Sequence, residues 1–149
     1  MNSDVCYIEP TEELKASLSS EEYAVLVRAA TEPPFKNAYW NNHAQGLYVD
    51  RIDGTPLFAS TAKFDSGTGW PSFWKPLDEK ALVLTDDYSF GMHRIEVRSR
   101  SSGGHLGHLF DDGPQPTGKR YCVNSASLRF IPRSRMEKEG YGRWDYLFK

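Results

Sequence analysis

Short apolar or alternating runs, separated by turn residues, fill most of the chain after residue 46, and this pattern restricts the fold more than any other feature. The runs are residues 47–49, 56–58, 81–84, 92–98, 106–110, 120–123 and 127–131. Asp53-Gly54, between the first two, is typical of a tight hairpin. Because no helical pattern separates the runs, we predict a mainly β fold with antiparallel sheet rather than alternating strands and helices.

The first third of the chain predicts two short helices. Thr11 precedes two glutamates and is typical of a helix cap. Ser19 and Glu22 have the spacing of a capping box, and apolar residues follow at helical period. We expect Pro33-Pro34 to end the second helix, because proline cannot continue one.

A chain of 149 residues suits one domain with a real core, so we expect a single domain over residues 1–149. Residues 1–18 are an expected N-terminal extension. Residues 132–149 are an expected C-terminal tail, whose aromatic residues Trp144, Tyr146 and Phe148 dock on the body of the domain.

Composition excludes several classes of protein. The net charge of −2 gives no reason to expect binding to nucleic acid or to an anionic membrane. Two cysteines cannot form a disulfide framework, and the chain has neither a signal-peptide pattern at its start nor an apolar run that spans a bilayer. We therefore expect a cytoplasmic protein with reduced thiols.

Cys122 has an unusual setting. If residues 120–123 form a strand, Arg120, Cys122 and Asn124 share one face. The guanidinium then favours the thiolate and lowers the thiol pKa from its free value of about 8.5. We predict a nucleophilic cysteine, although a buried structural cysteine is the commoner role of this residue type.

Two further segments have residues suited to chemistry. Residues 64–73 place glycines and a proline around Trp70, which fits either a loop that presents the indole or a structural turn. Residues 103–114 hold His105 and His108 next to Asp112. With Cys122 these residues leave metal binding and cysteine-protease chemistry open, although Arg120 would oppose a metal cation beside the thiol.

Together the segments resemble the methionine-R-sulfoxide reductases of type B. The resemblance extends over roughly residues 20 to 131. The matching stretches are residues 31–35, 46–48, 56–58, 69–73, 91–96, 105–108, 112–114 and 120–128.

The resemblance implies a fold and an activity. The fold is two antiparallel sheets, β-tent-like, with short N-terminal helices. The activity is that of an oxidoreductase in which the Cys122 thiolate attacks the sulfur of methionine-R-sulfoxide, free or in proteins. Methionine is released and a sulfenic acid remains on the enzyme.

The resemblance also implies residue roles. His108 is the better proton donor to the sulfoxide oxygen, with His105 beside it and Asp112 orienting one of the two rings. Asn124 hydrogen-bonds the substrate or a histidine, and Arg120 favours the thiolate. Trp70 and Phe110 are the expected substrate-binding residues, with the indole receiving the S-methyl group.

The chain departs from the family pattern at the resolving cysteine, where Thr68 stands. An external thiol must therefore reduce the sulfenic acid, or Cys6 must resolve it. Thioredoxin is the expected reductant, and glutaredoxin or another small thiol is an alternative.

Zinc-containing relatives carry two Cys-x-x-Cys pairs. Asp50, Asp53, Ser99 and Ser102 occupy these positions here. Since a closed structural zinc site needs thiolates that this chain lacks, we expect no zinc and no other cofactor. The aspartates are expected to tie the two hairpins through ion pairs with Arg98 or Arg100 and through hydrogen bonds.

Two other hypotheses remain. A ligand-binding module could use the same scaffold with Trp70 in an aromatic cage, although such a module does not need the thiol and both histidines. The chain could also be one part of a bifunctional enzyme whose other domain reduces the S epimer.

Overall fold

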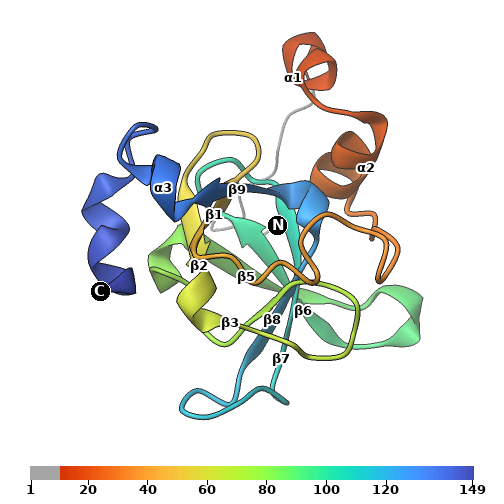
Figure 1. Ribbon diagram of the computed structural model, residues 1–149. Coiled ribbons are helices and arrows are strands. Elements are labelled where there is room, and N and C mark those ends of the chain that lie inside the picture. Colours follow the sequence, from red (N-terminus) through yellow and green to blue (C-terminus); the bar gives the residue numbers. More distant parts are fainter. Residues whose placement is uncertain (1–10) are drawn as a thin grey trace.

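Nine strands lie in residues 11–149, the part of the chain that the computed structural model describes. They form two antiparallel sheets, which confirms the predicted fold class (Figure 1). The smaller sheet has the order β2-β1-β9, formed by Pro56–Ala59, Gly46–Asp50 and Leu128–Pro132. The larger has the order β3-β4-β8-β7-β6-β5, formed by Lys63–Phe64, Ser72–Phe73, Arg120–Val123, His105–Phe110, Arg94–Ser99 and Leu82–Asp87.

The two predicted N-terminal helices are α1, Glu12–Ser17, and α2, Ser20–Arg28. Thr11 caps the first, and the capping box of Ser19 and Glu22 starts the second, as predicted. The predicted end of α2 at Pro33-Pro34 is wrong. The helix stops at Arg28 because Ala29 adopts the left-handed conformation, with φ of 57°.

An aromatic core lies between the sheets. Phe58 and Phe73 stack with ring centroids 4.5 Å apart, and Tyr48 meets Phe73 edge to face at 5.1 Å. Tyr121, the residue before Cys122, packs against Phe58 on this side. Strand β8 is thereby anchored through Tyr121, while the thiol of Cys122 faces the other way.

The C-terminal residues cover the outer face of the smaller sheet. Helix α3, Arg133–Met136, and the 3₁₀ segment Gly142–Phe148 lie beside β1 and β2 in Figure 1. Met136 joins Leu47, Val49 and Ile131 in a second buried cluster. The partly buried residues Tyr141, Trp144, Leu147 and Phe148 pack on it. Every residue of β1 is buried as a result, because both faces of that strand are covered.

The turns that contain Asp50, Asp53 and Ser102 are held by hydrogen bonds. Ser102 Oγ donates to Asp50 Oδ2 at 2.6 Å, and Thr55 Oγ1 lies 3.0 Å from Ser101 Oγ. Asp53 accepts the N–H of Thr55 within its own turn. These contacts join the β1–β2 hairpin to the β6–β7 hairpin.

The expected ion pairs of these aspartates with arginines are wrong. Arg98 pairs with Glu96 at 3.1 Å, and Arg100 donates to the carbonyls of Lys80 and Leu82. Both guanidiniums bind groups of the larger sheet and its adjoining turn, so they do not reach the aspartates. The Asp50 carboxylate instead accepts from a hydroxyl and a backbone N–H.

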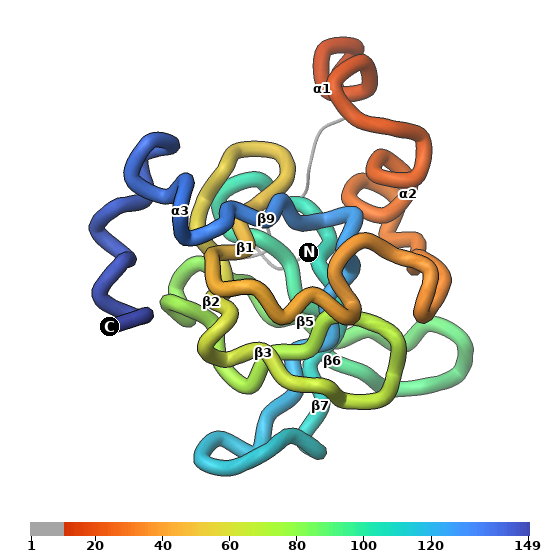
Figure 2. The backbone as a smooth tube through the Cα atoms, viewed as in Figure 1, coloured from red at the N-terminus to blue at the C-terminus, as the bar shows by residue number. Residues whose placement is uncertain are grey.

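Residues 29–45 connect α2 to β1 without a helix or strand, as Figure 2 traces. This connection matters for the site because its first part, around Thr31 and Glu32, contacts Asn124, which follows β8, and the loop at Trp70. In residues 11–149, no helix combines the length and the hydropathy that crossing a bilayer requires.

Candidate active site

A pocket of about 90 Å³ opens on the larger sheet beside Cys122. It is lined by Thr31, Trp70, Arg94, Gly107, His108, Phe110, Cys122, Val123 and Asn124. Five of the predicted site residues thus share one hollow, and Cys122 is half-buried at its lining rather than sealed in the core.

The backbone register places His108 directly opposite Cys122. The two residues are paired across β7 and β8, and Ser72 of β4 is paired with Cys122 on the other side. Side chains that are opposite in an antiparallel pair have Cβ atoms about 5 Å apart on the same face. The thiol and the imidazole are therefore held together by strand pairing, from opposite sides of a hairpin.

A β-bulge brings the second histidine close to the first. The register passes from Val97↔Gly107 directly to Arg98↔His105. Leu106 is the extra residue, and such bulges re-aim side chains beside active sites. His105 and His108 consequently meet with ring centroids 5.6 Å apart, edge to face.

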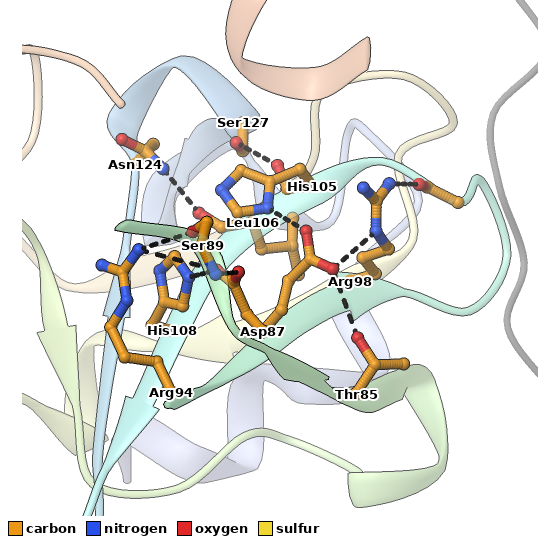
Figure 3. Close-up of polar contacts among 12 residues, drawn as sticks. Thr85, Asp87, Ser89, Arg94, Arg98, His105, Leu106, His108, Asn124 and Ser127 are labelled. Carbon is orange, nitrogen blue, oxygen red and sulfur yellow. Dashed lines mark hydrogen bonds and ion pairs between the residues drawn. The ribbon is translucent and has the colours of Figure 1, made fainter. Parts of the chain in front are cut away.

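His108 is held by a carboxylate from β5. Its Nε2 lies 2.7 Å from Asp87 Oδ2, and Arg94 Nη2 lies 3.5 Å from the same oxygen (Figure 3). Burial lowers the pKa of His108, and the hydrogen bond to Asp87 opposes that shift. The bond from His108 and the N–H of Ser89 hold the pKa of Asp87 well below its usual range. Asp87 is therefore an anion that orients the ring.

His105 lies behind His108 and does not line the pocket. Its Nδ1 bonds Glu96 Oε2 at 2.7 Å, and Glu96 also pairs with Arg98. Burial alone raises the pKa of Glu96, but the bond from His105 and the charge of Arg98 outweigh it and lower that pKa to about 2. His105 thus supports His108 from the protein side.

Arg120 is fixed by Asp112. The guanidinium donates to both carboxylate oxygens, at 2.8 and 3.2 Å, and lies over the ring of Phe110 with Cζ 4.3 Å from the centroid. The expectation that Asp112 orients a histidine ring is therefore wrong. Asp112 follows β7 and faces the start of β8, so it reaches Arg120, whereas Asp87 and Glu96 come from β5 and β6.

Opposing effects act on the pKa of the Cys122 thiol. Burial raises its pKa, while the charge of Arg120 and hydrogen bonds from Thr68 and Arg120 lower it, and Glu32 adds a small opposing effect. The expected direction of the Arg120 effect is present, but the net shift is upward because burial dominates. The sequence shows the cation and does not show the depth of the thiol.

Asn124 and Trp70 both line the pocket. Asn124 Nδ2 donates to the carbonyl of Leu106 at 2.9 Å (Figure 3), and its Oδ1 accepts the N–H of Glu32 at 3.1 Å. The indole N–H of Trp70 donates to the carbonyl of Glu32 at 2.9 Å. The Asn124 side chain thus bonds backbone groups of Leu106 and Glu32, and it positions the connection that contains Glu32 rather than a histidine ring.

Residues 11–149 hold no group of three or more His, Cys, Asp or Glu side chains that could bind a metal ion. Cys6, the possible resolving cysteine, lies outside the described residues.

Comparison with known proteins decides the family. The family described as SelR domain matches residues 18–132, which is most of the chain. The chain belongs to the SelR family. It is thus a member of the type B methionine sulfoxide reductases, the family that its motifs resemble.

A relative of this SelR domain is the "Peptide methionine sulfoxide reductase MsrA/MsrB" of Vibrio cholerae serotype O1. It is 53% identical over 144 residues, which cover 96% of this chain. The chain spans 38% of the length of that protein, so most of the relative lies outside the similarity.

Several residues around the site had no role in the sequence analysis. Asp87 gave no local signal, because its partner His108 is 21 residues away. Glu96 falls in the alternating run 92–98, and its place opposite His108 follows only from the strand register. Thr31 and Glu32 belong to the family-matching stretch 31–35, but nothing in the sequence links that stretch to Cys122.

Proposed function

We propose that this SelR domain reduces methionine-R-sulfoxide to methionine with Cys122 as the nucleophile. The observation that carries the proposal is the register pairing of Cys122 with His108, both lining one pocket that Trp70 also lines. A nucleophile, a proton source and an apolar wall are the three elements that sulfoxide reduction needs.

The chemistry balances with these groups. The Cys122 thiolate attacks the sulfoxide sulfur, the sulfur–oxygen bond breaks, and the oxygen ends on Cys122 as a sulfenic acid. The substrate sulfur gains two electrons, the cysteine sulfur loses two, and the oxygen takes up a proton. Arg120, held by Asp112, stabilises the thiolate against the cost of its burial.

His108 supplies the proton in this proposal. Its Nε2–H bonds Asp87, so Nδ1 is the ring atom that carries the transferable proton in the imidazolium. Asp87 stabilises the imidazolium, and His105 with Glu96 supports the ring pair from behind. General acids of this kind typically accelerate a reaction by about 10²–10⁴.

The R selectivity follows because Trp70 fixes the place of the methyl group and His108 fixes the place of the oxygen. The S-methyl group packs on the half-buried Trp70, with Phe110 beside it, and the oxygen must then point to His108. The opposite epimer exchanges the two groups and places the oxygen against the indole, where it loses its proton source.

Regeneration requires an external thiol, with thioredoxin as the proposed reductant and glutaredoxin as the alternative. Thr68 forms hydrogen bonds with Ser66 and with the thiol of Cys122, and it cannot form a disulfide. Cys6 stays a candidate for the resolving residue. Unchanged turnover of Cys6→Ser with thioredoxin would remove Cys6 from the mechanism.

Stoichiometric zinc by elemental analysis would contradict the prediction that the fold needs none.

The test uses resolved R and S sulfoxides with dithiothreitol as reductant. We expect turnover of the R epimer alone, its loss in Cys122→Ser, and a trapped sulfenic acid after a single turnover without reductant. Turnover by Cys122→Ser at the wild-type rate, or equal rates for the two epimers, would refute the proposal.

A further inference from the structure

Glu32 is a carboxylate buried beside the pocket and has no role in the chemistry above. It is 2% exposed, and it lies next to the pocket-lining Thr31 in the connection between α2 and β1. Burial raises its pKa. Buried carboxylates are retained in proteins when they hold several hydrogen bonds together, so its partners indicate its role.

The carboxylate of Glu32 caps the segment that follows Asn124. Its Oε2 accepts the N–H of Ser125 at 2.5 Å, and its Oε1 accepts the N–H of Ala126 at 2.8 Å. These amides begin the 3₁₀ turn Ser125–Ser127, directly after β8. One side chain thus fixes the backbone three and four residues beyond the nucleophile.

The backbone of Glu32 bonds two residues that line the pocket. Its N–H donates to Asn124 Oδ1 at 3.1 Å, and its carbonyl accepts the indole N–H of Trp70 at 2.9 Å. Asn124 and Trp70 come from distant parts of the sequence, and within residues 11–149 Glu32 hydrogen-bonds to both.

We propose that Glu32 is a positioning residue that sets the relative positions of Trp70 and Asn124 in the pocket lining, and thereby the binding of the substrate methyl group and the R preference. This inference rests on the proposed function for its choice of substrate.

The charge of Glu32 argues against a direct role in activating the thiol. It raises the pKa of Cys122, together with the larger effect of burial, so it works against thiolate formation. Removal of the charge should therefore lower the pH midpoint of Cys122 alkylation, whereas loss of the positioning should raise the KM for the substrate. The two effects of Glu32 can thus be told apart.

The decisive variant is Glu32→Gln in the full chain. A glutamine places an NH₂ group against one of two backbone donors, so one of the two bonds is lost. We expect the KM for free methionine-R-sulfoxide to rise about tenfold with a smaller change in kcat, and the ratio of R to S turnover to fall. The pH midpoint of Cys122 alkylation by iodoacetamide should move down.

Glu32→Asp separates geometry from charge. The shorter side chain keeps the charge and cannot span both amides, so the KM should rise while the alkylation midpoint stays near the wild-type value. Should Glu32→Gln fail to fold by circular dichroism, Glu32→Asp decides. Glu22→Gln, at the exposed capping box of α2, is the matched control and should leave KM and epimer ratio unchanged.

Nuclear magnetic resonance of the indole N–H of Trp70 gives a readout independent of activity. The inference requires that this signal shift in both Glu32 variants, because the acceptor carbonyl moves. An unshifted indole signal with unchanged KM in a folded variant would overturn the role of Glu32. An inactive wild-type enzyme with a shifted indole signal would instead refute the proposed function.

Discussion

At the scale of single residues, the separation of Cys122 and His108 is set by backbone pairing rather than by a bond between the two side chains. Each is then tuned by a partner of opposite charge, Arg120 for the thiol and Asp87 for the imidazole. Since burial opposes the charged form of both groups, these partners determine the pH range of activity.

Asp87→Asn is expected to narrow that range. Asp87 raises the pKa of His108 against burial, so its loss lowers that pKa and moves the alkaline limit of kcat to lower pH. At pH 7.5 we expect a decrease of about tenfold or more. A pH profile of kcat with the R epimer checks this.

Asp86→Asn is the matched control, because Asp86 is exposed and pairs with His93 instead. Its profile should coincide with that of the wild type. A profile of Asp87→Asn that keeps the wild-type alkaline limit would show that Asp87 does not tune the proton donor.

The sequence predicted the residues of the pocket better than their partners. Cys122, Trp70 and His108 were predicted from local motifs, and the structure places all three around one hollow. Asp112 was assigned to a histidine ring from the family resemblance, whereas hydrogen-bond partners across a sheet depend on register. A one-residue bulge is enough to change them.

At the scale of elements, helix α2 begins where the sequence predicts and ends earlier than predicted. The capping box is a local signal, so it is readable. The end depends on Ala29 in the left-handed region, with the N–H of Ala30 bonded to the carbonyl of Ala24 at 3.0 Å. Alanine gives no sequence signal for such a cap, since glycine is the usual residue there.

Ala29→Gly should therefore stabilise the protein. Glycine adopts a φ of 57° without the Cβ clash, and we expect a gain of about 1 kcal/mol in the free energy of unfolding. Ala24→Gly, inside the same helix, should lower it by about the same amount. Urea unfolding of the two variants checks this, and destabilisation by Ala29→Gly would contradict it.

At the scale of the whole molecule, the buried charges of the larger sheet tie stability to pH. Glu96 has a folded pKa of about 2, against an ordinary value of 4.5. An acid whose folded pKa is lowered contributes stability that is present above the ordinary pKa. That contribution is lost as the pH falls from about 4.5 through 2.

Glu96→Gln should flatten this dependence. Between pH 6 and pH 2.5 we expect the free energy of unfolding of the variant to fall by about 2–3 kcal/mol less than that of the wild type. Urea midpoints across this range measure it. The exposed Glu79→Gln should keep the wild-type slope, and an equal slope for Glu96→Gln would contradict the assignment.

The mainly β, antiparallel class was readable at this scale because turn residues and strand-length apolar runs are frequent after residue 46. The division into two sheets came from the family resemblance alone. The sequence did not reveal that both faces of β1 are covered, which depends on the packing of Met136 and the residues after it.

The bulge at Leu106 decides on which side of the sheet the two histidine rings lie. With this one unmatched residue, two rings three positions apart lie on the same side of the sheet. Inserting one more residue between them would turn one ring to the opposite side and separate it from its neighbour, whereas deleting Leu106 would leave a regular strand with the rings two positions apart on the same side. Such an insertion is better tolerated in residues 114–118, in the loop beyond the pair Phe110↔Arg120 and past Asp112, which holds Arg120.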